Sequence, residues 1–153
     1  MKFPSKEIVE RVRRQYPAGA RVELTRMEDV QAPPIGTKGT VVGVDDTASI
    51  MVQWDNGSHL NVVYGEDQCR IIKETLKEFL REHPLAVIHI MSPGGYVDMN
   101  PEKTNQLLNG QSMKGHPGDM ESWVKIPAND LLNQVICTCR FHNGIYEMLT
   151  ESV

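Results

Sequence analysis

The stretch "IMVQWDNGSHLNVVYGED", residues 50–67, decides how the first half of the chain folds. Large apolar residues occupy alternate positions before the turn, with the period of a strand that buries one face: Ile50, Val52 and Trp54. Asn56-Gly57 is a preferred pair for a two-residue type I′ turn, in which both residues have positive φ. Apolar residues recur after the turn at the same spacing: Leu60, Val62 and Tyr64. The stretch therefore predicts a tight β-hairpin.

A short amphipathic helix is predicted before this hairpin. Ser5 is a typical N-cap residue, and the apolar residues that follow have helical spacing: Ile8, Val9 and Val12. Tyr16-Pro17 ends the segment, because proline does not continue a helix.

Three more strands are predicted around the hairpin, at residues 21–25, 39–44 and 69–72. A long connection rich in proline and glycine separates the first two. Five short strands with a long first loop, a short second loop and a tight third hairpin follow the order of SH3-like small barrels. We therefore predict an α+β protein in which residues 1–72 form an N-terminal helix and a five-stranded SH3-like barrel.

The remainder, residues 73–153, predicts a second, small α+β domain. Helices are indicated by the amphipathic "KETLKEFLREHP", by the Asn100-Pro101 start signal and by "ANDLLNQ". Strands are indicated by "LAVIHIM", "YVDM", "WVKIP", "VICTCRF" and "IYEMLT".

The composition predicts a globular protein, with 40% hydrophobic and 24% charged residues among 153. No stretch resembles a signal peptide or a membrane span, and three cysteines are too few for a disulfide framework. We therefore expect a cytoplasmic protein.

Charge is distributed unevenly along the chain. Residues 1–20 carry a net charge of +3, residues 21–72 carry −4 and residues 73–153 carry −3. The total of −4 disfavours a dedicated nucleic-acid binder, because phosphate neutralisation needs a basic face. We expect the basic helix to dock against its own acidic domain. The alternative nucleic-acid contacts are Arg11, Arg13 and Arg14.

The long first loop and the adjoining hairpin form the predicted surface for a protein partner. Its candidate contacts are Met27, Glu28, Asp29, Pro33, Pro34, Trp54 and Tyr64. Trp54 is open to two interpretations. It shares the parity of Ile50 and Val52, which favours a place in the core, whereas an exposed tryptophan would be a ligand platform.

Metal and cofactor binding are not expected. Thiolates and imidazoles bind zinc, and Cys137, Cys139 and His142 lie close together in the sequence. A CxC pair in a strand, however, places both sulfur atoms on the face shared by Val135 and Phe141, which is typical of buried cysteines. No second CxxC or HxxxH pair is present.

Catalysis has weak support in the sequence. His116 and Asp119, in the Gly110–Met120 loop, have the chemistry of an acid–base pair, but no serine or cysteine nucleophile motif accompanies them. Solvated loop residues are the favoured interpretation. His89, inside an apolar strand, is interpreted as a satisfied strand histidine.

Three segments, "PSKEIVERVRRQYPAGARVEL", "APPIGTKGTVVGVDD" and "VQWDNGSHLNVVYGED", resemble a family of short bacterial domains of unknown function that occur on phages and other mobile elements. The resemblance covers residues 1 to ~70. It implies a small barrel and a mobile-element setting, and it implies no activity. More distantly, "VQWDNG" is similar to the peptide-binding SH3-like repeats of mind-bomb-type ubiquitin ligases, and "GTKGTVVGV" is similar to the KOW element of ribosomal and transcription proteins.

Three functions are consistent with these observations. The leading hypothesis is a non-enzymatic interaction protein of a mobile element that binds a protein partner, with inhibition of a host defence system as a specific version. The second is a nucleic-acid accessory factor that uses the basic helix. The third is an enzyme with its site in the Gly110–Met120 loop.

Overall fold

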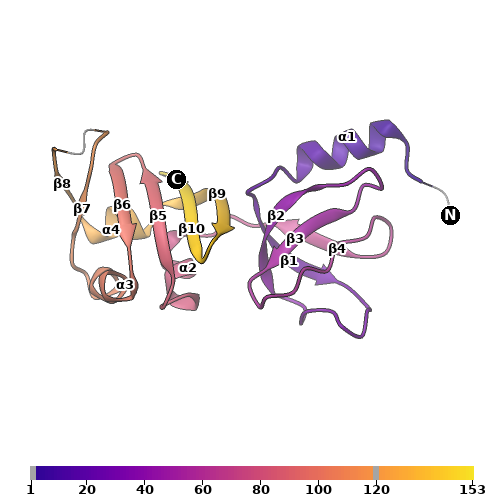
Figure 1. The fold of residues 1–153 in the computed structure, drawn as a ribbon, viewed down its shortest axis with the longest axis horizontal. Helices are drawn as coiled ribbons and strands as arrows, with labels where there is room; N and C mark the ends of the chain where they lie inside the picture. Colours follow the sequence, from indigo (N-terminus) through magenta and orange to yellow (C-terminus); the bar gives the residue numbers. More distant parts are fainter. Residues whose placement is uncertain (1–2, 119–120) are drawn as a thin grey trace. The chain divides into compact units, whose positions relative to one another are not determined.

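The computed structural model describes residues 3–118 and 121–153. The chain divides into two compact units, Met1–Ile72 (unit 1) and Lys73–Val153 (unit 2). Both units combine helices with β-sheets, so the fold is mixed α+β (Figure 1). No helix in the described part of the chain has the length and apolar character needed to cross a bilayer.

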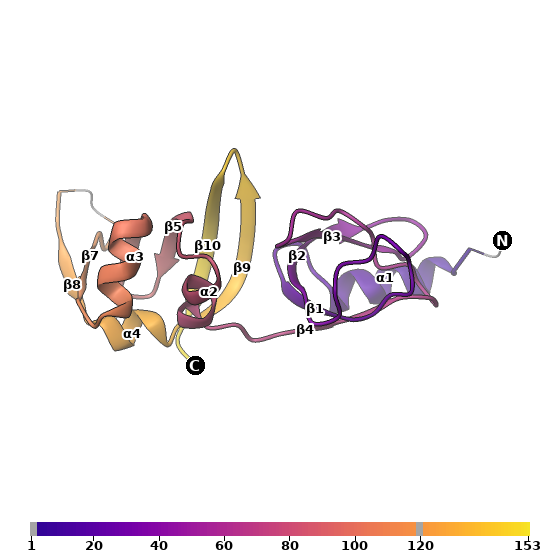
Figure 2. The ribbon, with the colours of Figure 1, turned by 90° about the horizontal axis from the view of Figure 1, so that it is seen from below.

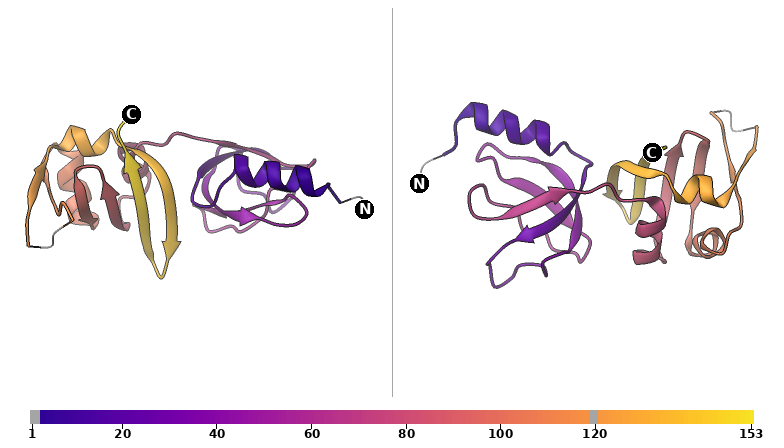
Figure 3. Two further views of the ribbon diagram at one scale, coloured as in Figure 1. Left: turned by 90° about the horizontal axis from the view of Figure 1, so that it is seen from above. Right: turned by 180° about the vertical axis from the view of Figure 1, so that it is seen from behind.

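Unit 1 begins with helix α1 (Lys6–Gln15), which lies along one side of the strands (Figure 3). The Ser5 hydroxyl accepts a hydrogen bond from the Ile8 amide, as its N-cap position predicts. Val9 and Val12 are buried on one side of the helix and belong to the core of unit 1. The amphipathic pattern therefore predicted both the helix and its packing face.

The sheet of unit 1 is antiparallel and consists of β1 (Arg21–Arg26), β2 (Lys38–Val44), β3 (Ile50–Trp54) and β4 (Gln68–Ile71). The strand order is β3-β2-β1-β4, so the first and last strands are neighbours. The alternation predicted for β3 is confirmed, because all three predicted inward residues are buried: Ile50, Val52 and Trp54.

The predicted fifth strand at residues 60–64 is wrong. The structure has a single bridge there, in which Val62 and Ile50 exchange backbone hydrogen bonds of 2.8 and 2.9 Å. Side chains bind the neighbouring backbone groups instead. The indole of Trp54 donates to the Leu60 carbonyl, and an Asp67 carboxylate oxygen accepts from the Val63 amide. The sheet therefore has four strands, and a closed barrel is not observed.

The predicted type I′ turn at Asn56-Gly57 is also wrong. Gly57 has a φ of +92°, but Asn56 is not among the residues with positive φ. The Gly57 amide donates to the Trp54 carbonyl over 2.9 Å, and the Trp54 amide donates to the Ser58 carbonyl over 3.0 Å. These bonds define a three-residue loop that ends in a left-handed glycine, so the chain needs positive φ at one position only. The Asn56 side chain accepts the Ser58 amide hydrogen bond, at 3.0 Å.

Unit 2 contains a four-stranded sheet of order β6-β5-β10-β9 and a two-stranded sheet of β7 and β8. Its elements are α2 (Leu76–Glu82), β5 (Val87–Ser92), β6 (Gly95–Met99), α3 (Pro101–Leu108), β7 (Met113–Gly115), β8 (Val124–Ile126), α4 (Ala128–Leu132), β9 (Val135–His142) and β10 (Ile145–Glu151). Strands β5 and β10 are parallel at the centre, and the outer pairs are antiparallel. Thr75 and Asn100 cap α2 and α3 through their side chains.

The helices of unit 2 cover one face of the four-stranded sheet. Figure 1 shows the strands side by side, and Figure 2 shows α2 and α3 on one side of them. All three helices contribute leucine or phenylalanine side chains to one core. These residues are Leu76, Phe79 and Leu80 of α2, Leu107 of α3, and Leu131 and Leu132 of α4. The strands contribute their inward residues to the same core: Ile88, Ile90, Val97, Met99, Ile136, Cys139 and Met148.

A β-bulge in β9 changes the faces predicted for its cysteines. Leu149 pairs with Thr138 while the next residue of β10 pairs with Ile136, so Cys137 is an additional residue in β9. Cys139 and Ile136 are buried, whereas Cys137 is half-buried. The two sulfur atoms therefore do not share the environment that simple alternation predicted.

Candidate functional site

The candidate site of unit 1 is a cleft between the β1–β2 loop and residues 60–67, which we call the acidic cleft. Its volume is about 490 Å³. Its lining residues are Arg26, Met27, Glu28, Asp29, Leu60, Asn61, Val63, Gly65, Glu66 and Asp67. The cleft thus combines apolar contact area with a concentration of carboxylates.

The loop wall, residues 27–37, is held by its own turns. An Asp29 carboxylate oxygen accepts a 2.7 Å hydrogen bond from the Gln31 amide. The Pro34 carbonyl accepts two more from Thr37, one from the hydroxyl at 2.6 Å and one from the amide at 3.0 Å. Because side chains and prolines restrain the backbone, this long loop has a defined shape.

The opposite wall, residues 60–67, depends on Trp54. The indole Nε1–H donates to the Leu60 carbonyl over 2.8 Å, and Trp54 is 1% exposed. Asp67 accepts the Val63 amide over 2.9 Å and braces the next turn. Trp54 is thus a core residue that positions the cleft, and its assignment as a direct partner contact is corrected.

The charges of the acidic cleft are of two kinds. Asp29 and Asp67 are bound to backbone amides of their own walls. Glu28 and Glu66 are exposed, and no hydrogen bond from either side chain is found among the described residues. With Arg26 as the single base in the lining, the cleft has an excess of negative charge. Glu28 and Glu66 are the carboxylates free to meet a cationic partner.

The predicted partner contacts are dispersed in the structure. Three of them line the acidic cleft: Met27, Glu28 and Asp29. Within the long loop, Pro33 is buried and Pro34 is exposed. Tyr64 is 42% exposed but lines another hollow of unit 1, of about 580 Å³, beside α1.

Sequence reasoning missed seven lining residues. They are Arg26, Leu60, Asn61, Val63, Gly65, Glu66 and Asp67. A strand was expected at residues 60–64, and alternation would have directed its side chains to two faces. The signal that could have found them is the acidic turn "GED" directly after this segment.

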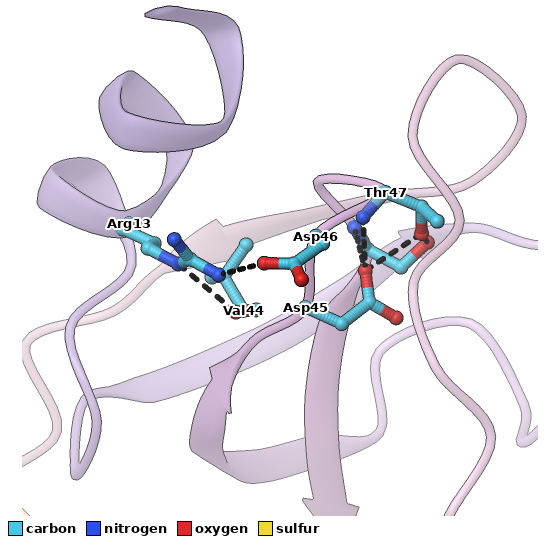
Figure 4. Close-up of polar contacts among 6 residues, drawn as sticks. Arg13, Val44, Asp45, Asp46 and Thr47 are labelled. Atoms are coloured by element: carbon cyan, nitrogen blue, oxygen red, sulfur yellow. Dashed lines mark hydrogen bonds and ion pairs between the residues drawn. The ribbon is translucent and has the colours of Figure 1, made fainter. Parts of the chain in front are cut away.

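The three arginines of α1 have different surroundings. The Arg13 Nε–H donates to the Val44 carbonyl over 3.1 Å, and Nη2 lies 2.9 Å from an Asp46 carboxylate oxygen (Figure 4). Arg11 lines the hollow beside α1, and Arg14 is exposed. One of the three predicted nucleic-acid contacts is therefore used to dock the helix on its own domain.

The turn that receives Arg13 is itself built by a carboxylate. One Asp45 oxygen accepts from the Thr47 amide, the Thr47 hydroxyl and the Ser49 amide, at 2.9, 2.6 and 3.0 Å (Figure 4). Burial acts to raise the pKa of Asp45, but these hydrogen bonds and the Arg13 charge together lower it. Asp45 is thus an ionised brace of the β2–β3 turn.

The residues considered for zinc in the sequence lie in different environments. Cys139 lies in the helix-covered core of unit 2, and His142 is exposed at the end of β9. The Cys137 thiol faces the Val135 carbonyl, and burial together with Glu151 raises its pKa. In unit 1, burial raises the pKa of the Cys69 thiol to about 12.

The Gly110–Met120 segment contains strand β7, so it is not a simple loop. His116 exchanges backbone hydrogen bonds with Tyr96, and its ring packs on Trp123 with centroids 3.7 Å apart. The proposed partner Asp119 lies outside the described residues. His89 lies in strand β5, as predicted, and its side chain is exposed, with its Nε2 3.8 Å from an Asp98 oxygen.

Comparison with known proteins supports an uncharacterised domain in the first half of the chain. Searches of the curated proteins and of the solved structures found no match. A family model does match, over residues 5–72, which include α1 and all four strands of unit 1. Residues 5–72 are similar to the family described as Domain of unknown function (DUF4314).

Proposed function

We propose that this chain is a non-enzymatic interaction protein, and that its acidic cleft binds a basic segment of a partner protein. The observation that carries the proposal is the pairing of two exposed glutamates with apolar side chains from both walls. Basic side chains have long apolar stems and charged ends, so they complement such a lining.

The rigidity of both walls supports recognition. The loop wall is braced by Asp29 and Thr37, and the opposite wall by Trp54 and Asp67. A preformed cleft loses less conformational entropy on binding than mobile loops do. Because two of the four carboxylates already serve this bracing, we assign the cleft to binding rather than to catalysis.

The proposal also includes a barrel topology for unit 1 and a mobile-element setting for the gene. The neighbouring positions of β1 and β4 and the long first loop support an SH3-like barrel topology for unit 1. We place the protein in the cytoplasm of a host cell that carries a phage or mobile element, with a host defence protein as one specific partner. Genes that neighbour this one test the setting: defence and counter-defence genes agree with it, and a metabolic operon contradicts it.

The binding test uses the full chain and a labelled peptide of alternating lysine, arginine and leucine, followed by fluorescence anisotropy. A peptide of the same length with glutamate in place of the bases is the control probe. Glu28→Gln with Glu66→Gln should weaken binding roughly fivefold, because two exposed ion pairs contribute about 1 kcal/mol together.

A matched double variant distinguishes the effect of charges in the cleft from the effect of the protein's net charge. Glu7→Gln with Glu10→Gln makes the same change in net charge on α1 and should leave the affinity within roughly twofold of the wild-type value. Capture of proteins from the native host with both variants then identifies the natural partner. Equal affinity of the two double variants for the basic peptide contradicts the proposal.

A further inference from the structure

The four-stranded sheet of unit 2 has one uncovered face. The residues that alternate with the core residues on β5, β6, β9 and β10 point away from the helices. Several of them are large and apolar yet exposed, with Met91 at 42%, Tyr96 at 45% and Leu149 at 45%. Exposed apolar side chains that are neighbours on one surface indicate an interaction site.

Strand register aligns four polar side chains across this face. His89 pairs with Asp98 on β6 and with Glu147 on β10, and Glu147 pairs with Arg140 on β9. In sheet order the row is Asp98, His89, Glu147 and Arg140, which we call the polar row. Each member lies beside a neighbour of complementary charge or hydrogen-bonding character.

A second row lies two residues further along each strand. Met91 pairs with Tyr96 and with Leu149, and Leu149 pairs with Thr138. In sheet order this apolar row is Tyr96, Met91, Leu149 and Thr138. On the other side of the polar row, Val87 pairs with Ile145 at the centre of the sheet.

Residues of the two rows line a hollow of about 510 Å³, and Ile90 and Met148 line it as well. Met91 and Leu149, on the adjacent strands β5 and β10, both line it. Flexible side chains from a facing surface can enter such a hollow and pack against these two residues.

The face is complementary to itself. A two-fold axis parallel to the strands, midway between two such faces, places β6 of one copy opposite β9 of the other and β5 opposite β10. Asp98 then faces Arg140 of the second copy, and His89 faces Glu147 of the second copy. Met91 faces Leu149, and Val87 faces Ile145. An isologous contact requires this reciprocal matching.

We propose that the uncovered face of the unit 2 sheet is a dimer interface between two copies of this chain. Two carboxylates in the polar row disfavour a nucleic-acid backbone, and its single arginine disfavours a uniformly basic partner. A second copy places a complementary side chain opposite each member of the polar row. It also buries the Met91–Leu149 and Val87–Ile145 contacts between the copies. Stacked sheets with interdigitated inner faces, ~10 Å apart, are an established packing arrangement.

The size of the face sets the expected affinity. Four strands ~4.8 Å apart and three rows of side chains make a patch of roughly 20 by 15 Å. This is smaller than the ~800 Å² per partner of a standard interface. The dimer should therefore have a Kd on the order of 10 µM, and it should depend strongly on each charge pair.

Sedimentation velocity of the full chain between ~1 and ~500 µM, a range chosen around this Kd, tests the inference. The wild-type protein should shift from monomer to dimer mass across the range. Arg140→Glu should raise the Kd at least ~10-fold, because it places a carboxylate opposite Asp98 of the second copy. Asp98→Arg should have the same effect, because it places a second guanidinium opposite Arg140.

The double variant Asp98→Arg with Arg140→Glu is the decisive measurement, because it exchanges the charges and restores the pairing only between copies. The double variant should dimerise again. Lys125→Glu on β8 changes the net charge by the same amount as Arg140→Glu and is the control for that single variant. Thermal unfolding of each variant shows whether it is folded. A monomeric wild type at ~500 µM, or a dimer unaffected by either single charge reversal, overturns the inference.

Discussion

The two units use their sheets differently. Unit 1 buries Trp54 and the inward residues of its four strands beneath α1 and presents its candidate site on loops. Unit 2 covers one sheet face with three helices and presents polar and apolar rows on the other. The loop site depends on turn hydrogen bonds, whereas the rows depend on strand register alone. A site on loops is therefore sensitive to distant bracing residues, whereas a site on strands is sensitive to its own side chains.

The largest expected effect is on stability, and it differs between the two tryptophans, Trp54 and Trp123. Trp54→Ala should lower the free energy of unfolding of unit 1 by ~3 to 5 kcal/mol, since it removes a large core side chain. Trp123→Ala in unit 2 should cost less than ~1 kcal/mol, because Trp123 is 60% exposed. Urea unfolding followed by circular dichroism measures both. Similar losses of stability in the two variants would contradict the assignment of Trp54 to the core and of Trp123 to the surface.

The next effect compares the two faces of one strand in unit 2. Ile90→Ala should destabilise by ~2 to 5 kcal/mol, because Ile90 is 1% exposed beneath the helices. Met91→Ala, on the uncovered face, should cost less than ~0.5 kcal/mol in the monomer and should weaken dimerisation. Thermal unfolding at low concentration and sedimentation at high concentration distinguish these roles. A large loss of monomer stability from Met91→Ala would contradict the assignment of faces.

The third effect compares the two hairpin turns. Gly57→Ala should cost ~1 to 2 kcal/mol because an alanine resists the φ of +92°, whereas Asn56→Ala should cost only ~0.5 kcal/mol. In the second hairpin both Asn143 and Gly144 have positive φ, at 53° and 78°. Asn143→Ala should therefore cost more than Asn56→Ala. Unfolding curves of the variants check the order, and equal costs at the two asparagines would restore the type I′ assignment for the first turn.

The effect that is smallest at neutral pH concerns the buried thiol of unit 1. Burial raises the pKa of Cys69 from 9.0 to about 12, so the folded form keeps its proton over a range in which the unfolded chain loses it. This contribution to stability is fully present below pH 9 and is lost as the pH rises toward 12. Tryptophan fluorescence in a Trp123→Phe background follows unit 1. The decline in stability between these pH values should be shallower in Cys69→Ala, and parallel declines would contradict it.

Local patterns predicted much of the fold. Ser5 and the spacing of Val9 and Val12 predicted α1 and its buried side, and Asn100-Pro101 predicted the start of α3. The alternation of Ile50, Val52 and Trp54 predicted β3. These predictions succeed because caps and side-chain periodicity act within a few residues. The strand predicted at residues 60–64 was wrong, because the side chains of Trp54 and Asp67 bind the Leu60 carbonyl and the Val63 amide, which a strand would use for pairing.

Local sequence patterns predicted most of the elements, the mixed α+β class and the acidic character of the long loop and the "GED" turn. Only the tertiary structure decided that Glu28 and Glu66 line one cleft, because loop closure brings together residues distant along the chain. It also decided that four polar side chains form one row on unit 2. That row depends on the parallel pairing of β5 with β10, strands separated by more than fifty residues, and long-range pairing carries no local sequence signal.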